Sequence, residues 1–303
     1  LISAFAQLLE DTDDDLDISN ESGPAKGVIT RSDALHICYC FSPMRYLWDM
    51  YPDYLKTSNF LIRLFMVPCF HYLRLWDVST ANRVDNFLTI SHAVKARVKR
   101  WWKRDSEVLY PPVDLVRLKA TSDDSFVSPF SDEPYYIYLG ALVSYKRVDL
   151  AVEVCRTLGK NLLVIGSGSE FKKLKEFSGD KIKFITNADD KLVKQALSNA
   201  KALLFPGEED FGIVVLEAMA CQTPVIAYRR GGAIDTVTED TGLFFLEQTK
   251  ESLAEAIAKF ENIPENFWKK ENFLGHVNKF SKENFKKQFL EAVLKQLEEK
   301  KNN

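Results

Sequence analysis

The chain has 303 residues, of which 46% are hydrophobic and 27% are charged, so it is long enough for two medium-sized domains that each bury a core. The net charge of -3 and the isoelectric point near 5.9 argue against a dedicated nucleic-acid-binding protein, which normally has a basic excess. The five cysteines form no Cys-x-x-Cys pair and are odd in number. Their pattern indicates neither a disulfide framework nor a zinc site and favours a reducing, cytoplasmic setting.

The first 118 residues predict a partial α/β domain. The acidic run at 10–17 is interpreted as a solvated loop, because Leu16 stands where the turn of a calcium-binding loop requires Gly, and no first strand is expected before Asp17. Strand-like stretches occur at 34–39, 86–90 and 107–109, and helical patterns at 58–76 and 92–103. The apolar stretch 59–76 is interrupted by charged residues and a proline, so it predicts a buried helix rather than a membrane span.

Residues 91–104 contain six basic side chains and no acidic one. Val94, Val98, Trp101 and Trp102 fall near one helical stripe, which leaves two interpretations open. The helix could dock on an anionic membrane surface, or it could pack on its own sheet through the stripe while its charges stay in solvent.

Residues 119–134 are rich in Ser, Asp and Pro and predict a linker beside an interdomain cleft. A second domain follows at 135–275, where short apolar runs alternate with amphipathic segments, the pattern of a doubly wound parallel sheet. Its expected strands are 135–142, 162–165, 181–185, 202–205, 224–228 and 242–246. We expect residues 276–303 to form a helical end that packs back across the two domains.

The segment 201–228 carries the chemistry, with the order strand, loop, helix, strand. Its helix is apolar nearly all round except for Glu217, a carboxylate that needs partners if it is buried. Glu209 lies eight positions earlier, in the loop at the carboxyl end of a strand, where open α/β sheets bind ligands. The amides of Phe211, Gly212 and Ile213 begin the helix and predict a site for a phosphate. The plainer alternatives are a buried ion pair at Glu217 and a solvated loop at Glu209.

Gly166 and Gly168 also follow a predicted strand and could be mistaken for a dinucleotide fingerprint. The third glycine of that motif is missing, because Phe171 occupies its position. We therefore interpret this segment as a strand-to-helix turn near a nucleotide base, and expect Thr186 and Asn187 to border the same pocket.

Glu209 and Glu217 match the E-x7-E motif of glycosyltransferase family 4, and their surroundings resemble the donor site of that family. The resemblance continues through LGALVSYKRVDL at 139–150, VIGSG at 164–168 and GGAIDTV at 231–237. In the first domain, HICYCFSPMRYLWDMY from 36, RLWDVSTANRVDNFLTIS from 74 and YPPVD from 110 are similar to the branch that transfers mannose in bacterial O-antigen and capsule assembly. About residues 17 to 260 are covered.

The resemblance implies the GT-B fold, two Rossmann-like domains facing across a cleft, and a role for each matching residue. Lys146 would be the cation on the donor diphosphate, Glu209 the carboxylate that holds the transferred sugar, and Glu217 the acceptor for the ribose hydroxyls. The remaining substrate-binding positions that it implies are Gly140, Ala141, Arg147, Asp210 and Arg45. No metal or cofactor is expected, since the nucleotide sugar is a co-substrate.

Two positions depart from the family pattern. Ala141 stands where relatives have an Arg, and Phe41 stands where they have a His.

As a whole, the resemblance implies a retaining hexosyltransferase, with GDP-mannose as donor and a lipid-linked glycan as acceptor, peripheral to the inner membrane face. The alternatives are a UDP-sugar-dependent enzyme of the same family and a diverged or truncated non-catalytic nucleotide-sugar-binding protein. A dinucleotide oxidoreductase is a more distant third.

Overall fold

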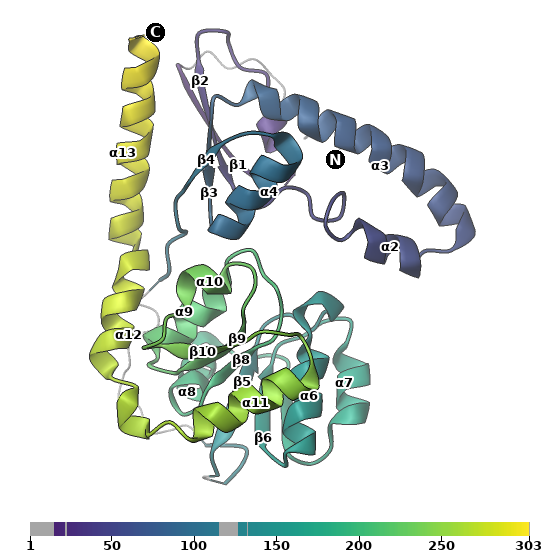
Figure 1. The fold of residues 1–303 in the computed structure, drawn as a ribbon, viewed down its shortest axis with the longest axis vertical. Coiled ribbons are helices and arrows are strands. Elements are labelled where there is room, and N and C mark those ends of the chain that lie inside the picture. The colour runs from purple at the N-terminus through teal and green to yellow at the C-terminus, as the bar shows by residue number, and fades with distance from the viewer. Residues whose placement is uncertain (1–14, 22, 115–126, 132, 303) are drawn as a thin grey trace. The chain divides into compact units, whose positions relative to one another are not determined.

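The computed structural model describes residues 15–21, 23–114, 127–131 and 133–302, which form two compact units. Unit 1 comprises residues 1–111 together with 285–303, and unit 2 comprises 112–284 (Figure 1). The first boundary therefore falls before 118, and most of the predicted linker lies outside the described residues. The second falls at 284 rather than 275, and α13 (Lys282–Lys301) belongs to unit 1 from Phe285 onward.

Unit 1 contains a four-stranded parallel sheet in the order β1-β2-β3-β4. Its strands are β1 (Leu16–Glu21), β2 (Leu35–Cys40), β3 (Asn86–Thr89) and β4 (Ser106–Val108). All six residues of β2 are buried, so both faces of the sheet are covered. From α13, Phe285 and Phe289 pack on Tyr39 of β2 with ring centroids 5.7 and 6.4 Å away.

The expectation that no strand begins before Asp17 is wrong. β1 starts at Leu16 and pairs in parallel with β2, with Leu16 opposite Leu35 and Ile18 opposite Ile37. This strand lies at the sheet edge, where polar side chains such as Asp17 and Asn20 are tolerated, and its short alternation of apolar residues was hidden by the acidic run before it. Residues 10–14 of that run lie outside the described residues.

The helices of unit 1 are α2 (Tyr51–Thr57), α3 (Phe60–Thr80) and α4 (His92–Trp102). Asn59 caps α3 by accepting from the Ile62 amide at 2.9 Å, and Ser91 caps α4 by accepting from the Val94 amide at 3.1 Å. Short 3₁₀ turns complete the unit at Ala25–Gly27 and Ala81–Arg83.

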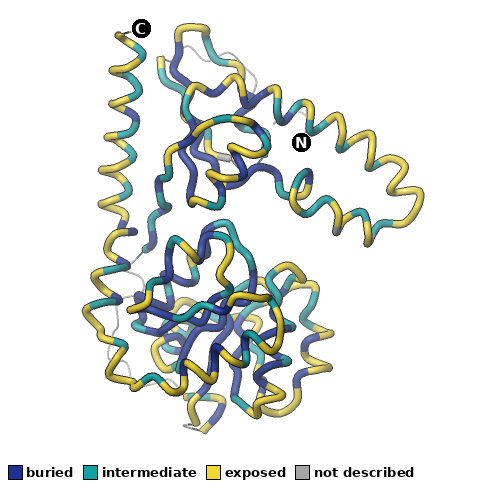
Figure 2. Tube along the Cα trace, in the orientation of Figure 1, coloured by how far each residue is buried: buried dark blue, intermediate teal, exposed yellow. Residues whose placement is uncertain are grey.

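The prediction that residues 59–76 form a buried helix is wrong in its burial. Figure 1 shows α3 extending away from the sheet of unit 1, and Figure 2 shows that most of its length is exposed. Phe60 is 77% exposed and Phe65 and Tyr72 are each 69% exposed. Apolar composition was read as burial, although nothing in the sequence pattern specified a layer that would cover this helix.

In α4, Val94 and Val98 are fully buried and Trp102 is 2% exposed. These three residues of the stripe therefore pack inward, as the second interpretation expected, whereas Trp101 is half-buried. The basic residues Lys95, Lys99, Arg100 and Lys103 are exposed.

Unit 2 contains a six-stranded parallel sheet in the order β10-β9-β8-β5-β6-β7, which confirms the predicted doubly wound domain. Its strands are β5 (Tyr135–Leu139), β6 (Asn161–Ile165), β7 (Ile182–Ile185), β8 (Leu203–Phe205), β9 (Val225–Tyr228) and β10 (Gly242–Phe245). The first strand ends at Leu139 rather than 142, because Gly140 has a φ of +147° and leaves the strand conformation.

The connections of unit 2 are helical. The longer helices are α6 (Val148–Thr157), α7 (Phe171–Ser178), α8 (Asp190–Ser198), α9 (Ile213–Ala220), α11 (Lys250–Glu261) and α12 (Lys270–Val277). Shorter turns are η3 (Ser144–Lys146), α10 (Ala233–Thr236), η4 (Glu265–Phe267) and η5 (Asn278–Phe280). Across the part of the chain that the structure describes, every helix is too short or too polar to cross a bilayer.

Candidate functional site

The candidate site of unit 2 lies where the direction of strand progression reverses. β5 is flanked by β6 on one side and β8 on the other, so the chain first adds strands in one direction and then in the opposite one. In open α/β sheets the loops that leave the two strands at such a switch point diverge, and ligands bind there beyond the carboxyl ends of the strands. Residues 140–147 follow β5 and residues 206–212 follow β8, so the predicted residues Gly140, Lys146, Glu209 and Gly212 meet at this switch point.

Lys146 and Glu209 form the charged centre of the site. The Lys146 Nζ lies 2.8 Å from the Glu209 Oε1, and the two side chains are 16% and 20% exposed. Lys146 ends the short turn η3, and Arg147 after it adopts a left-handed conformation with φ of 52°. The ion pair is thus held close to the surface of the unit, with limited access to water.

Two glycines lie against Lys146, and Gly207 is the one whose missing side chain permits the close approach. A Cβ on Gly207 would lie 2.8 Å from the Lys146 Cα, and a Cβ on Gly140 would lie 3.6 Å from the Lys146 Nζ. Tyr138 lies beneath them, and its hydroxyl donates to the Ala141 carbonyl at 3.1 Å. Burial raises the pKa of Tyr138, and the negative charge of Glu209 raises it further, so the hydroxyl stays a neutral donor.

The turn at 166–168 supports the Lys146 loop from the side of β6. A Cβ on Gly166 would lie 1.9 Å from the Gly140 carbonyl oxygen, and one on Gly168 would lie 2.3 Å from the Leu142 carbonyl oxygen. The Leu142 amide donates to the Ser167 carbonyl at 2.8 Å. The two glycines therefore serve the close packing of two loops, and α7 begins at Phe171 where a dinucleotide motif would have its third glycine.

The Glu209 loop leads into α9 through Gly212, whose φ of +81° and ψ of 61° make it a left-handed cap. Gly231 and Gly232 support this loop, since the Gly232 amide donates to the Glu209 carbonyl at 2.9 Å and a Cβ on Gly231 would lie 2.1 Å from that oxygen. In the first turn of α9 the Val215 amide donates to the Gly212 carbonyl at 3.0 Å, whereas the amides of Ile213 and Val214 come too early for an acceptor in the helix ladder and, together with the helix dipole, favour an anion.

Residues on α9 divide between core and surface. Val215, Leu216, Ala218 and Met219 are fully buried. Glu217 is half-buried, and it lies one turn after Ile213, which is 46% exposed; residues four apart share one helix face. Glu217 therefore lies on the face of α9 that the core does not cover, rather than deep inside the unit.

The predicted anion-site residues beside α9 contribute differently. The ring of Phe211 is 4% exposed and packs on Phe280 at a centroid distance of 6.0 Å, so only the backbone of Phe211 is available to a ligand. Asp210 is half-buried next to Glu209, and Ile213 presents an apolar side chain at the helix start.

The Arg147 side chain is engaged in hydrogen bonds within unit 2. Its Nε donates to Asp149 at 3.2 Å and its Nη1 donates to the Gln248 Oε1 at 3.2 Å, while the Gln248 Nε2 donates to the Pro206 carbonyl at 2.7 Å. Arg147 therefore ties the loops after β5, β8 and β10 together. Ala141 is exposed, and its methyl group offers no polar atom to a ligand.

The other predicted residues belong to different elements, two of them in unit 2 and two in unit 1. Thr186 and Asn187 are exposed and follow β7, two strands from β5 in the sheet. Arg45 belongs to unit 1, where its carbonyl accepts from the Trp48 and Met50 amides at 3.2 and 2.8 Å. Phe41, also in unit 1, is 39% exposed and makes an edge contact with Tyr39 at 5.3 Å.

Sequence reasoning missed Tyr138, Gly207 and Gln248. Gly207 carried a signal, because it lies in the Pro206–Gly207 turn between β8 and Glu209. Tyr138 is a strand residue with an apolar neighbourhood and Gln248 lies in a polar loop, so neither gave a signal in the sequence. In the described residues, no group of three or more His, Cys, Asp or Glu side chains is arranged to hold a metal ion.

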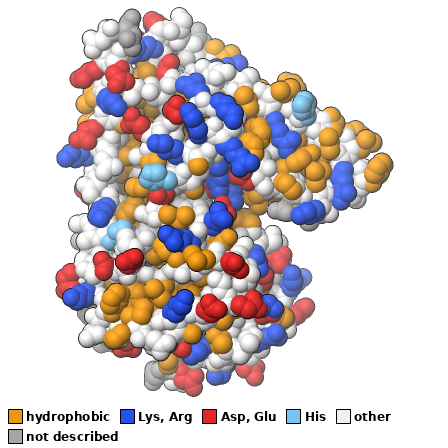
Figure 3. Space-filling model, in the orientation of Figure 1, with side chains coloured by type: hydrophobic (Ala, Val, Ile, Leu, Met, Phe, Trp, Pro, Cys, Tyr) orange, Lys and Arg blue, Asp and Glu red, His pale blue; other side chains and the backbone are white. Residues whose placement is uncertain are grey.

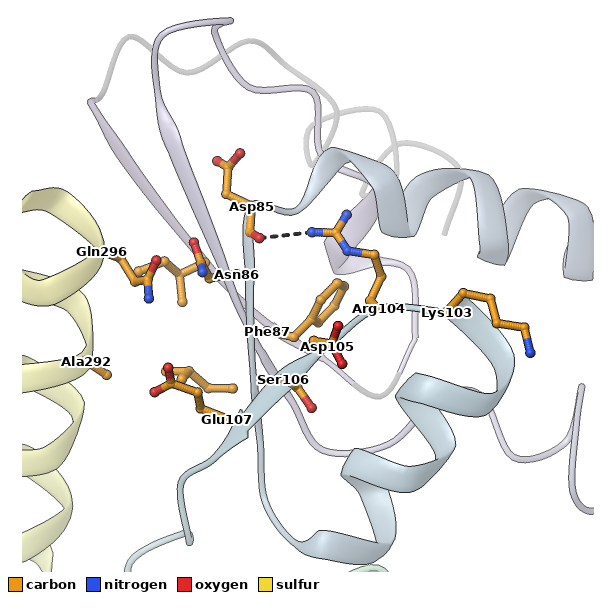
Figure 4. A pocket seen from close by; sticks show the side chains of 12 residues that line it. Asp85, Asn86, Phe87, Lys103, Arg104, Asp105, Ser106, Glu107, Ala292 and Gln296 are labelled. Carbon is orange, nitrogen blue, oxygen red and sulfur yellow. Dashed lines mark hydrogen bonds between the residues drawn. The ribbon is translucent and has the colours of Figure 1, made fainter. Parts of the chain in front are cut away.

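Unit 1 has a separate pocket of about 380 Å³ between α13 and the strands β3 and β4 (Figure 4). Its wall includes Arg104, whose guanidinium donates to the carbonyls of Ala81, Val84 and Asp85. The pocket lies beside Asn86 and Ser106, at the amino ends of these strands, opposite the edge where parallel sheets bind ligands.

Comparisons with known proteins agree with this arrangement. The family described as Glycosyl transferases group 1 matches residues 121–275, just over half of the chain. The human alpha-1,3/1,6-mannosyltransferase ALG2 is 28% identical over 251 residues, covering 71% of this chain and 58% of ALG2. The O-antigen chain mannosyltransferase RfbU of Salmonella typhimurium is 24% identical over 212 residues, covering 67% of this chain and 58% of RfbU.

The chain thus spans about half the length of the curated relatives it matches. Among solved structures, Anabaena HepE in complex with UDP aligns with a TM-score of 0.67 at 15% identity, covering 86% of this chain and 79% of HepE, a likeness of fold. The parallel sheets of both units match the GT-B glycosyltransferase fold. Together with the family match across residues 121–275, this shows that the chain belongs to the group 1 glycosyl transferases.

Proposed function

We propose that this chain transfers a hexose from a nucleotide sugar with retention of configuration at the sugar carbon. The observation that carries the proposal is the Lys146–Glu209 ion pair at the switch point of unit 2, beside the start of α9. It combines a cation and a helix amino terminus, both suited to a diphosphate, with a carboxylate suited to sugar hydroxyls.

The proposed chemistry follows from charge. When the bond between the sugar and the diphosphate breaks, negative charge grows on the leaving phosphate oxygen. A fixed Lys146 ammonium and the amides at Gly212 and Ile213 stabilise that developing charge more than they stabilise the bound donor, which lowers the barrier. Because no metal is required for these contacts, we propose that the chain acts without one.

In the free protein, Lys146 is neutralised by Glu209. A bound diphosphate would compete for the same ammonium, and the transferred sugar would take over the Glu209 carboxylate through its hydroxyls. We propose that binding of the whole donor therefore exchanges one internal ion pair for two contacts with the ligand, so neither charge is left uncompensated.

The half-buried face of α9 supports a second contact. Glu217 lies one turn after Ile213, the first residue of the helix. A carboxylate can accept from both hydroxyls of a vicinal diol, and we propose that Glu217 binds the ribose of the nucleotide. Thr186 and Asn187, at the end of β7, are proposed to border the base.

For the sugar and acceptor, we propose mannose from GDP-mannose and a lipid-linked glycan in cell-surface polysaccharide assembly. Support comes from two relatives named as mannosyltransferases, one of them acting on O-antigen chains. A UDP-sugar is the rival donor, favoured by the HepE structure that contains UDP. With such an acceptor the chain would act in the cytoplasm, peripherally at the inner membrane face.

A non-catalytic nucleotide-sugar-binding protein is the second candidate. It is favoured by Phe41 and Ala141, which replace two polar side chains of the family, and by the commitment of Arg147 to Asp149 and Gln248. A turnover assay with GDP-mannose and UDP-glucose separates the candidates. Release of nucleoside diphosphate supports transfer, and binding without any turnover supports the binding protein.

A further inference from the structure

Helix α3 presents an unusual amount of apolar surface. Eight of its large apolar side chains are 48–77% exposed: Phe60, Leu61, Ile62, Leu64, Phe65, Val67, Tyr72 and Leu75. At about 100° per residue, their positions cover more than half of the circumference of the helix. Surface of this extent marks a site of interaction rather than ordinary scattered exposure.

The carboxyl-terminal end of α3 is anchored to the rest of unit 1 through Asp77. Asp77 and Lys26 are fully buried and form an ion pair with a distance of 2.6 Å. The other oxygen of Asp77 accepts from the indole nitrogens of Trp48 at 2.8 Å and Trp102 at 2.7 Å. The helix is thus fastened to the loop before α2 and to α4, and its apolar portion is presented on a fixed support.

The sequence next to this surface is rich in cations, two of which have acidic partners: Arg97 pairs with Asp49 at 2.8 Å and Lys99 pairs with Asp105 at 2.7 Å. Between Tyr54 and Trp76 the sequence has three cations and no acidic residue, and between Asn86 and Arg104 it has six cations and no acidic residue. Helix α4 packs against α3. Figure 3 shows Lys and Arg side chains over α4 and hydrophobic side chains over α2 and α3 on the same face of unit 1.

The wide apolar arc of α3 and the cations beside it indicate which kind of partner covers this helix. A protein partner would cover one side of a helix, whereas here the exposed apolar arc exceeds half the circumference and is flanked by cations. A helix that lies in the plane of a bilayer buries such an arc among acyl chains while neighbouring cations meet anionic headgroups. Neither α3 nor any other described helix can span a bilayer.

We infer that α3 docks this chain on an anionic phospholipid surface, with its apolar side chains at the acyl boundary and the exposed cations of α4 at the headgroups. This deepens the proposed function, because a lipid-linked acceptor would be met at such a surface. It also reassigns the apolar contact from the α4 stripe, which packs inward, to α3.

Cys69 offers a direct probe. It is the exposed cysteine of α3, and Cys38, Cys40, Cys155 and Cys221 are buried. A maleimide fluorophore sensitive to polarity at Cys69 should shift its emission to the blue with vesicles of phosphatidylcholine and phosphatidylglycerol, and should be quenched by brominated acyl chains. The same fluorophore in Cys69→Ser/Leu290→Cys, on exposed α13, should show neither change.

Flotation of unlabelled protein with the same vesicles tests the side chains. Leu64→Asp/Phe65→Asp should weaken binding at least tenfold, while the matched control Leu290→Asp/Leu294→Asp should leave it unchanged. Lys95→Glu/Lys103→Glu should weaken it on the order of tenfold or more, since each cation near an anionic surface adds about fivefold. The substituted positions are exposed, so thermal melting should stay close to that of the wild type.

Absence of flotation with anionic vesicles, or an equal loss in the α3 variant and the α13 control, would overturn the inference. The inference would also be overturned if the wild type sedimented as a dimer without lipid and Leu64→Asp/Phe65→Asp sedimented as a monomer, because α3 would then bind a second copy. Titration with a nucleoside diphosphate measures ligand binding by unit 2 independently of the membrane. Absence of binding would count against the proposed function, but it would not change a positive flotation result.

Discussion

The Lys146 ammonium lies 2.8 Å from the Glu209 carboxylate, so the charge proposed to bind the donor diphosphate and the charge proposed to bind the sugar neutralise each other in the free protein. Both side chains are mostly buried, which strengthens their interaction relative to a pair on the open surface. This relationship makes the two residues respond differently to a bare nucleoside diphosphate and to a complete nucleotide sugar.

Replacing Lys146 by Met should lower transfer by about 10²–10³-fold, because it removes one fixed positive group from the developing charge on the leaving diphosphate. The measurement is kcat for release of nucleoside diphosphate. Lys181→Met is the matched control, since Lys181 is an exposed residue of the same unit whose ammonium donates to the Gly159 carbonyl at 2.9 Å. Equal activity in both variants would contradict the role of Lys146.

Glu217→Gln should weaken donor binding by about 10–100-fold, the range for hydrogen bonds to a charged group. The loss should be confined to the ribose. Wild-type protein should prefer a ribonucleoside diphosphate over its 2′-deoxy analogue, and the variant should lose that preference. If the variant keeps the full preference, the ribose is bound elsewhere.

Gly166→Ala should destabilise unit 2 by several kcal/mol, because its φ of +147° disfavours a side chain and the new Cβ would lie 1.9 Å from the Gly140 carbonyl oxygen. Gly275→Ala is the control: Gly275 lies in α12 with open space around the new Cβ, so the change should stabilise by about 0.5–1 kcal/mol. Urea unfolding measures both. Similar unfolding midpoints for the two variants would show that the loops do not pack as described.

Burial lowers the pKa of His36 in the folded protein, although the Arg83 carbonyl and nearby carboxylates oppose the shift. The unfolded chain therefore binds more protons as the pH falls below the ordinary value of about 6.5, and stability is lost from that pH downward through the lower folded pKa. Between pH 7 and pH 5, His36→Gln should show a smaller decrease in the free energy of unfolding than the wild type.

The sequence was a good guide to unit 2 and a poorer one to unit 1. Buried parallel strands can be recognised in a sequence as apolar runs, and all six predicted strands of unit 2 are confirmed. The edge strand β1 was missed because Leu16 and Ile18 are its only apolar residues. The exposure of α3 was missed because the spacing of apolar residues predicts that a helix forms, but it does not tell whether another element covers that helix.

The same distinction applies to the candidate site. Glu209, Gly212 and Lys146 could be predicted because motif, strand end and glycine coincide. The direction of the Arg147 side chain could not, since it depends on Asp149 and on Gln248, a residue 101 positions away.

Calorimetric titration of wild type and Glu209→Gln with GDP, UDP and the intact nucleotide sugar tests the central claim most directly. The account predicts that Glu209→Gln binds the preferred bare diphosphate at least as tightly as the wild type, because Lys146 is released, while it binds and turns over the complete nucleotide sugar less well. Failure of the wild type to bind either diphosphate, or an equal loss of affinity for diphosphate and nucleotide sugar in the variant, would contradict it.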